Sequence, residues 1–156
     1  MGIEIERKFL TGSEEWRDLG ESTEYRQGYL LAAPDRTVRV RTVGERGYLT
    51  VKGGSIGAAR AEYEYEIPIG DARELLDELC IRPLIEKRRT HIKHAGLTWE
   101  VDEFFGENHG LVIAEVELES EDQSVDLPPW IGEEVTGDPR YFNASLVTRP
   151  FSTWTV

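Results

Sequence analysis

A two-residue alternation of polar and apolar side chains runs through most of this chain and limits its fold more than any other feature. In residues 2–10, for example, Glu4, Glu6 and Lys8 alternate with isoleucine and phenylalanine. Successive side chains of a β-strand point to opposite faces, so this period predicts strands with one polar and one apolar face. We predict eight of them, near residues 2–10, 23–32, 36–43, 46–53, 60–68, 86–94, 97–104 and 111–120.

The connections between the predicted strands are short and rich in glycine. Residues 44–47 and 94–96 have the composition of hairpin turns, and residues 106–110 form a longer turn. Loops of this length join antiparallel neighbours, because a parallel pair needs a long crossover. The sequence therefore predicts an antiparallel, mainly β structure.

Three helical segments are predicted between and after the strands. Residues 71–80 begin with an Asp-x-x-Glu pattern and continue into a leucine stripe. A second segment begins near Pro128-Pro129. A third follows Asp138, which can cap a helix, and Pro139, which suits the first helical position. With no internal repeat or linker, residues 1–156 are predicted to form a single domain of the α+β class, mainly β.

Composition and charge restrict the function classes. Hydrophobic residues make up 39% of the 156 residues and Cys80 is the only cysteine, so we expect a folded domain without a disulfide framework. No apolar run is long enough for a signal peptide or a membrane span, which predicts a cytoplasmic protein with no membrane partner. The net charge of −12 disfavours binding along a nucleic-acid backbone. A phosphate ligand would therefore need a concentrated basic site.

The polar faces of the predicted strands are sorted by charge. A solvated face normally mixes lysine, glutamate, serine and threonine, whereas here whole strands are acidic or basic. The same-face charges, strand by strand, are Glu4, Glu6 and Lys8; Arg39 and Arg41; Lys52; Glu62, Glu64 and Glu66; Lys87 and Arg89; Glu100 and Asp102; Glu115, Glu117 and Glu119. An open sheet with one wet face remains an alternative. A closed barrel with these faces inward would need a charged ligand, since unpaired buried ions cost several kcal/mol each.

The opening Glu-x-Glu-x-Lys segment, from Glu4 to Lys8, resembles the signature of the CYTH, or triphosphate tunnel metalloenzyme, superfamily. Seven further blocks resemble the blocks of that superfamily in the same order, and the resemblance extends from residue 1 to about residue 149. They are Arg39–Arg41, Leu49–Lys52, Glu62–Glu66, Glu86–Arg89, Trp99–Asp102, Ala114–Leu118 and Glu134–Gly137. The resemblance implies an eight-stranded antiparallel closed β-barrel, a triphosphate tunnel, with a few short covering helices.

The resemblance also implies the roles of the inward side chains. The expected triphosphate-binding residues are Lys8, Arg39, Arg41, Lys52, Lys87 and Arg89. The expected ligands or supports of Mg²⁺ or Mn²⁺, two ions in all, are Glu4, Glu6, Glu62, Glu64, Asp102, Glu115 and Glu117, with Glu100 as a less secure addition. Lys8, Glu4 and Glu6 are expected to be catalytic. Hard divalent cations prefer carboxylate oxygens, and guanidinium groups match phosphate geometry.

The mechanism expected from this set is metal-assisted attack of water on a terminal phosphorus. One ion would bridge phosphate oxygens and the second would lower the pKa of the attacking water. Lys8 could donate a proton to the leaving group, although neighbouring glutamates oppose this by raising its pKa. The helix after Asp138 is expected to cover one tunnel mouth and to leave room there for a terminal phosphate.

Three activities remain open, all with a small-molecule triphosphate as partner. The first is hydrolysis of inorganic tripolyphosphate to pyrophosphate and phosphate, or of a nucleoside or thiamine triphosphate. The second is a class IV adenylate cyclase, and the third is a non-catalytic polyphosphate-binding module. The sequence also leaves a homodimer open.

Several other residues are assigned structural positions. The histidines at 91, 94 and 109 are expected to be exposed, and the four tryptophans and Cys80 are expected to pack in or over the core. Strand parity places Arg88 outside the barrel, between the inward Lys87 and Arg89. The tail at 150–156 is expected either to dock or to fray.

Overall fold

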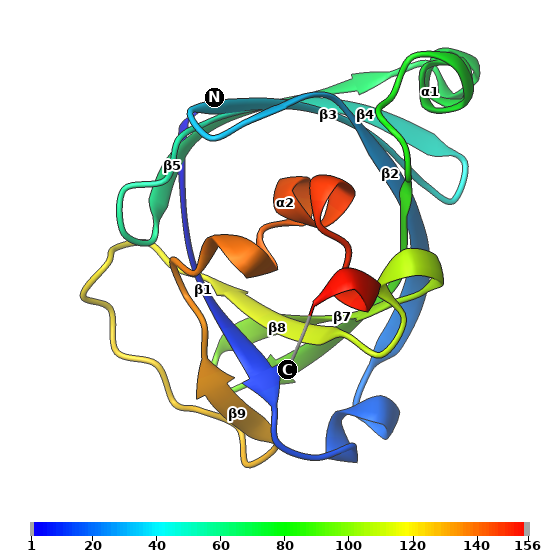
Figure 1. Cartoon of the computed structure of the whole chain (residues 1–156). Coiled ribbons are helices and arrows are strands. Elements are labelled where there is room, and N and C mark those ends of the chain that lie inside the picture. The colour runs from blue at the N-terminus through cyan, green and yellow to red at the C-terminus, as the bar shows by residue number, and fades with distance from the viewer. Residues whose placement is uncertain (1, 155–156) are drawn as a thin grey trace.

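The protein folds into a closed barrel of eight antiparallel strands with one additional short strand (Figure 1). The computed structural model describes residues 2–154. Its strands are β1 (Gly2–Thr11), β2 (Glu21–Ala33), β3 (Arg36–Val43), β4 (Arg46–Gly53), β5 (Ala59–Ile67), β6 (Ile85–His94), β7 (Leu97–Phe104), β8 (Val112–Glu117) and β9 (Ile131–Glu134). Neighbours follow the order β5-β4-β3-β2-β6-β7-β8-β1, and pairing of β5 with β1 closes the ring. The predicted eight-stranded barrel is confirmed.

The strand β1 is where the barrel closes. One edge of β1 pairs with β8 over residues 6–10, and its other edge pairs with β5 over residues 2–5 and then with β9. The sequence did not predict β9, and the helix predicted near Pro128-Pro129 is wrong. The segment is extended because the carbonyl of Trp130 accepts a hydrogen bond from Gly12 and the indole of Trp130 is buried against the outside of the barrel.

The helix α1 (Ile69–Glu78) packs on the outer faces of β3 and β4. It begins two residues earlier than predicted, directly after Pro68. Leu76 is fully buried beside Val40, but Leu79 is 66% exposed, so the predicted leucine stripe was wrong at that residue. The close approach of α1 depends on Gly47, because a Cβ there would lie 2.6 Å from the Cβ of Ala72.

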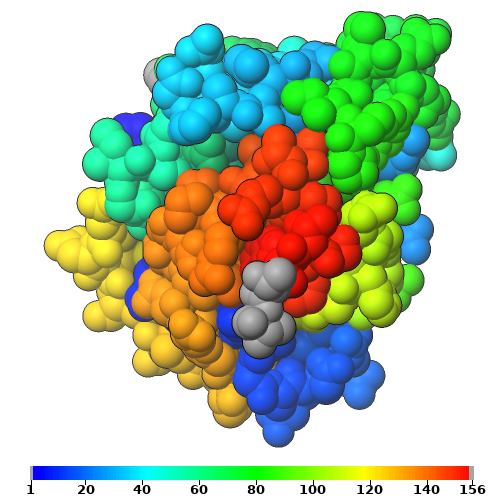
Figure 2. All heavy atoms as spheres, in the orientation of Figure 1, coloured from blue at the N-terminus to red at the C-terminus, as the bar shows by residue number. Residues whose placement is uncertain are grey.

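The C-terminal segment covers one end of the barrel. It contains the helix α2 (Asn143–Thr148) between 3₁₀ turns at Pro139–Tyr141 and Phe151–Thr153. Asp138 accepts a hydrogen bond from the backbone nitrogen of Arg140, which confirms the predicted cap. In Figure 1 α2 crosses the barrel opening, and in Figure 2 the orange-to-red C-terminal segment fills it. The prediction that this helix covers one mouth is confirmed.

Part of the tail docks on this cover. The indole of Trp154 packs edge-on against Tyr141, with ring centroids 5.2 Å apart, and also against Phe151. Of the two outcomes predicted for the tail, docking therefore holds through Trp154. The remaining part of that prediction, residues 155–156, lies outside the described residues.

Three apolar clusters hold the barrel and its covers together. One surrounds Trp99 on the outer wall and is covered by Trp16 and Trp130; one lies under α1; and one fills the barrel end beneath α2, around Phe104 and Leu146. The predicted packing of the tryptophans is confirmed for these three, which are at most 2% exposed. No helix within residues 2–154 is long and apolar enough to cross a membrane.

Candidate active site

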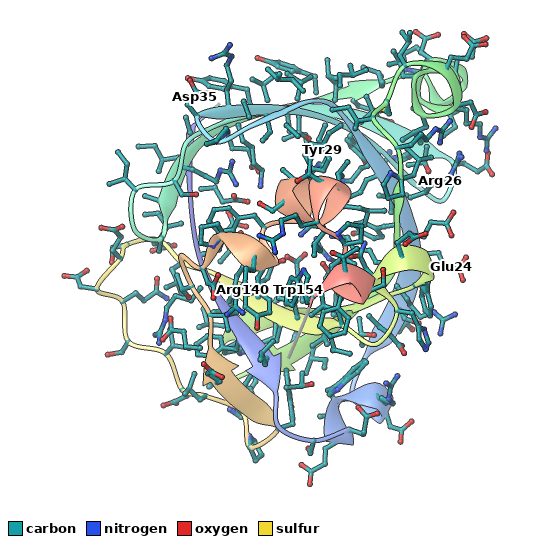
Figure 3. The ribbon with its side chains drawn as sticks, viewed as in Figure 1. Glu24, Arg26, Tyr29, Asp35, Arg140 and Trp154 are labelled. Atoms are coloured by element: carbon teal, nitrogen blue, oxygen red, sulfur yellow. The ribbon has the colours of Figure 1, made fainter. Side chains whose placement is uncertain are left out.

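The polar faces of the strands surround an interior cavity of about 180 Å³. In Figure 3 the ring of Tyr29 lies inside the barrel, above α2, whereas Glu24 and Arg26 of the same strand point outward. Seven cations line the cavity: Lys8, Arg39, Arg41, Lys52, Arg60, Lys87 and Arg89. Seven carboxylates face them: Glu4, Glu6, Glu62, Glu64, Glu100, Glu115 and Glu117. The cavity is thus balanced in charge, although the whole chain carries −12.

Asp102 anchors two of the cations from behind the cavity wall. Its carboxylate accepts hydrogen bonds from Nε and Nη2 of Arg89 at 2.7 and 2.9 Å, and it lies 2.8 Å from Nζ of Lys87. Burial opposes its ionisation, but Arg89 and Lys87 outweigh burial and lower the pKa of Asp102. The Asp102 side chain is fully buried and does not line the cavity, so its position is that of a support for the cations.

Lys87 lies at the covered end of the tunnel. Its ammonium donates to Oδ1 of Asn143 on α2 at 3.1 Å, and the same oxygen accepts from Gln27 at 2.9 Å. Complete burial lowers the pKa of Lys87 to about 8, although the Asp102 carboxylate opposes that shift. These contacts attach the covering helix directly to a cation of the tunnel wall.

Arg39 and Arg41 share one carboxylate on the neighbouring wall. Nη2 of each arginine lies 3.4 Å from Oε2 of Glu64, which also accepts a hydrogen bond from Thr50 at 2.8 Å. The Nε atoms of both arginines are buried and have no acceptor within residues 2–154. Burial, followed by repulsion from Arg39 and Arg89, lowers the pKa of Arg41. Unused guanidinium donors facing a cavity are suited to an anionic ligand.

A second ion-pair group joins β4 to β1 and β5. Nζ of Lys52 lies 2.8 Å from Oε1 of Glu4 and 3.3 Å from Oε2 of Glu62. Burial would raise the pKa of Glu4, but Lys52 more than offsets it and the pKa is lowered, whereas burial and the neighbouring Glu4 raise the pKa of Glu62. Burial and the same two glutamates raise the pKa of Glu117.

Glu6 and Glu115 form a carboxylate pair across the β1–β8 ladder, next to Lys8. Burial and the Glu115 carboxylate raise the pKa of Glu6 well above its ordinary value. Glu115 titrates in the opposite direction: burial opposes ionisation, yet the Lys8 ammonium and the hydrogen bond shared with Glu6 lower the pKa of Glu115. Lys8 lies 3.8 Å from Glu6, and the surrounding glutamates outweigh burial and raise the pKa of Lys8. Two like charges this close favour one shared proton.

The acidic residues suit divalent cations held in part by substrate. Within residues 2–154, no three Asp, Glu, His or Cys side chains are grouped closely enough to hold an ion by themselves. The carboxylates instead face the cavity in pairs, Glu6 with Glu115 and Glu4 with Glu62. In each pair the neighbouring carboxylate helps to raise the pKa of one member, Glu6 or Glu62. Mg²⁺ is commonly held by one or two carboxylates with substrate phosphates and water. The donor set fits such an ion.

The structure brings together the residues that the sequence selected. All six predicted phosphate-binding cations and six of the seven predicted metal-site acids line the cavity; Asp102 is the exception. Arg88 points outward with its side chain 45% exposed, as strand parity predicted. His91 and His109 are exposed as predicted, whereas His94 is only partly exposed.

Five described residues of the cavity wall were not selected from the sequence: Tyr29, Thr37, Arg60, Asn143 and Ala144. Arg60 could have been found, because it lies two residues before Glu62 and shares its face. Tyr29 and Thr37 carry no charge to mark them. Asn143 reaches the cavity only because α2 folds back over the barrel end. The alternation of residues within the strands does not predict that position of the helix.

Known proteins resemble this chain along almost its whole length. It is 54% identical over 151 residues to the inorganic triphosphatase of Acetivibrio thermocellus, covering 97% of each chain. It is 37% identical to the inorganic triphosphatase of Nitrosomonas europaea, covering 92% of this chain and 95% of that protein.

Solved structures and a family match agree with these relatives. A crystal structure of an inorganic triphosphatase matches with a TM-score of 0.67 and 36% identity, over 92% of this chain and 93% of that one. A putative adenylate cyclase from Bacillus halodurans shares the fold, with a TM-score of 0.63 at 17% identity over 100% of this chain and 94% of that one. The CYTH domain matches residues 2–151. The chain therefore belongs to the CYTH domain family.

Proposed function

We propose that this protein is a metal-dependent inorganic triphosphatase that hydrolyses tripolyphosphate to pyrophosphate and phosphate. The observation that carries the proposal is the closed cavity lined by seven cations and seven carboxylates, in which Arg39 and Arg41 keep unused donors. Two relatives named inorganic triphosphatase, at 54% and 37% identity, support the same activity. A linear, highly charged anion with divalent cations satisfies both halves of this lining.

The cations would bind and orient the phosphate chain. We assign phosphate contacts to Lys8, Arg39, Arg41, Lys52, Lys87 and Arg89, which enter the cavity from β1, β3, β4 and β6. Asp102 would hold Lys87 and Arg89 in place. Fixed cations of this kind stabilise the charge that spreads over a transferring phosphoryl group, and they need no rearrangement during the reaction.

The carboxylates would hold the metal ions. We assign this role to Glu4, Glu6, Glu62, Glu64, Glu115 and Glu117, with Mg²⁺ or Mn²⁺ as the ions and two as their number. When bound, such ions neutralise phosphate oxygens and supply a more acidic water. A proton held by Glu6, whose pKa is raised, would leave when a cation binds, because a ligating carboxylate is deprotonated.

Lys8 is better suited to binding than to proton donation. Its surrounding glutamates raise its pKa, so the ammonium keeps its proton near neutral pH. In the proposed reaction Lys8 remains positively charged and stabilises negative charge on the phosphate oxygens, while Glu4 and Glu6, on the same face of β1, complete the catalytic group of that strand.

Product analysis tests this function. Purified protein is incubated with tripolyphosphate, ATP or thiamine triphosphate, each with Mg²⁺ or Mn²⁺, and the products are resolved by anion exchange. We expect phosphate and pyrophosphate from tripolyphosphate, and loss of turnover in the Arg89→Ala variant but not in the matched Arg88→Ala variant. Cyclic AMP from ATP would replace the proposal with a cyclase, and binding without turnover would replace it with a phosphate-binding module.

A further inference from the structure

The aromatic ring of Tyr25 lies beside three cations of the tunnel wall. Its centroid is 4.9 Å from Cζ of Arg89, 5.1 Å from Cζ of Arg41 and 5.9 Å from Nζ of Lys87. All three distances fall within the range of about 6 Å over which an aromatic face attracts a cation. Tyr25 is 9% exposed and does not line the cavity. The ring therefore contacts these cations without occupying the space of a ligand.

The strand order explains why one ring reaches cations on two neighbouring strands. β2 lies between β3, which carries Arg41, and β6, which carries Lys87 and Arg89. Tyr25 is paired directly with Lys87 on β6 and with Val43 on β3. Arg89 and Arg41 each lie two residues from one of these partners, and diagonal neighbours at this spacing are within reach of an aromatic side chain. The register of β2 thus places the ring among the three cations.

An aromatic ring holds a cation differently from a carboxylate. Asp102 fixes Arg89 and Lys87 through ion pairs, which use some of their hydrogen-bond donors and neutralise their charge. The face of a ring attracts a cation but carries no net charge and takes up none of the donors in the plane of a guanidinium. A cation held by a ring therefore keeps its charge and its donors for phosphate oxygens.

Arg41 has little other support for its position. Its one acidic partner within residues 2–154 is Glu64, at 3.4 Å, and Arg39 shares that carboxylate at the same distance. Burial, and then repulsion from Arg39 and Arg89, lower the pKa of Arg41, so the surroundings oppose its charge. The ring of Tyr48 on β4 lies 5.8 Å from Cζ of Arg41. Rings from both strands that flank β3 thus lie near this guanidinium.

We propose that Tyr25 is a positioning residue of the phosphate site, whose ring holds the three neighbouring cations in place while leaving their charge and donors to the phosphate chain. Without the ring, Arg41 and Arg89 would repel each other and move. Binding of the phosphate chain would then have to offset the entropy lost on ordering them. The inference rests on the proposed triphosphatase function and adds to it a residue that acts through the cations rather than on the phosphate.

Two substitutions separate the ring of Tyr25 from its hydroxyl group. Tyr25→Leu removes the ring and keeps an apolar side chain, whereas Tyr25→Phe removes only the hydroxyl group. Affinity for inorganic tripolyphosphate is measured by isothermal titration calorimetry in EDTA, which prevents metal-dependent turnover. We expect Tyr25→Leu to weaken binding about tenfold and Tyr25→Phe by less than about twofold. Wild-type affinity in Tyr25→Leu would overturn the proposal, and so would an equal loss in both variants, which would assign the effect to the hydroxyl group.

A series of fluorinated rings separates the charge of the ring face from its packing. Phenylalanine with one, two or three ring fluorines is placed at position 25, and each fluorine makes the ring face less negative with little change in size. We expect the Kd for tripolyphosphate to rise with each fluorine, up to about tenfold, at an unchanged Tm. The same series at Tyr65, which is 59% exposed on β5, is the matched control. Constant affinity across the series at position 25 would refute the proposal.

Hydrolysis is measured separately, so that this proposal and the proposed function can fail independently. With Mg²⁺ and tripolyphosphate, kcat/KM should follow the same order as the affinities. Binding that depends on the ring, without hydrolysis of any triphosphate, would refute the proposed function and retain the role of Tyr25. Hydrolysis with the same kcat/KM in wild-type protein and Tyr25→Leu would retain the function and refute that role. If the wild-type protein bound no tripolyphosphate in either EDTA or Mg²⁺, both would be refuted.

Discussion

The carboxylate of Asp102 and the guanidinium of Arg89 form a paired hydrogen bond, at 2.7 and 2.9 Å, on an aspartate with no exposed side-chain surface. Asp102→Ala should therefore destabilise the protein by about 3–5 kcal/mol, because it leaves Arg89 and Lys87 buried without their shared counter-charge. Urea denaturation followed by fluorescence measures the loss. The exposed Asp126→Ala is the control, and equal stability of the two variants would contradict the prediction.

Strand parity gives a second prediction. Arg39→Ala or Arg41→Ala should lower kcat by about 10²–10³, the loss seen when one fixed stabilising group is removed from an active site. Arg88→Ala should have nearly wild-type kinetics, since its side chain is outside the barrel. Steady-state assays with tripolyphosphate compare these three variants with Arg89→Ala. A defect in Arg88→Ala as large as that in Arg89→Ala would show that the register of β6 is wrong.

Removal of one carboxylate should act through metal occupancy. Glu6→Gln or Glu117→Gln is expected to weaken metal affinity and lower turnover, with partial recovery at high Mn²⁺. Activity is measured against metal concentration, and wild-type protein with excess chelator serves as the blank. Full activity in chelator would disprove metal dependence.

Mg²⁺ with tripolyphosphate should also raise the Tm of the wild-type protein, because ligands that bind only the folded state stabilise it.

Burial of Lys87 predicts a pH dependence of stability. Its pKa is about 8 in the folded protein, below the ordinary lysine value of 10.5. Between these values the unfolded chain binds more protons, so the free energy of unfolding contributed by this group rises with pH, by roughly 3 kcal/mol at most. Denaturation is measured for the wild-type protein and for Lys87→Met at about pH 7.5–10.5, a range that spans both pKa values. The difference in free energy of unfolding between the two proteins isolates the effect of Lys87. A difference that stayed constant with pH would contradict it.

The tunnel should favour inorganic tripolyphosphate over ATP. The tunnel walls present seven cations and seven carboxylates, which suit phosphate and metal rather than a nucleoside. Contacts that a nucleoside makes beyond these walls must first offset the entropy lost on ordering it. We expect a higher kcat/KM for tripolyphosphate at matched free Mg²⁺ or Mn²⁺. An equal or higher value for ATP would reverse the order of substrates.

The two-residue alternation of polar and apolar side chains was enough to identify most residues of the tunnel wall, but not the closure of the barrel or the residues at its covered end. It assigned Arg88 outward and Arg89 inward, because parity within one strand depends only on neighbouring residues. The two-residue alternation does not predict that β1 pairs with β5 to close the barrel, since an open sheet has the same alternation. It became an expectation only through the family resemblance, and the pairing of Glu4 with Arg60 shows it in the structure.

Two parts of the wall depend on contacts distant in sequence. The strand β9 has only four residues and is extended because it pairs with β1 and because Trp130 is buried beside it, so local composition gave the wrong element. Asn143 reaches the tunnel because Leu146 of the same helix is buried in the cluster beneath α2. Such positions are set by tertiary packing, which local propensity does not contain.

The position of β1 in the barrel also has a consequence for synthesis on the ribosome. This strand is made first, but its partners β5, β8 and β9 extend to Glu134. Glu4, Glu6 and Lys8 therefore emerge long before the wall that will enclose them exists. Pairings this distant in sequence form late and slowly. A nascent chain that ends before β8 has β1 without the neighbour that binds one of its edges, so synthesis of residues 112–134 decides when the tunnel first exists.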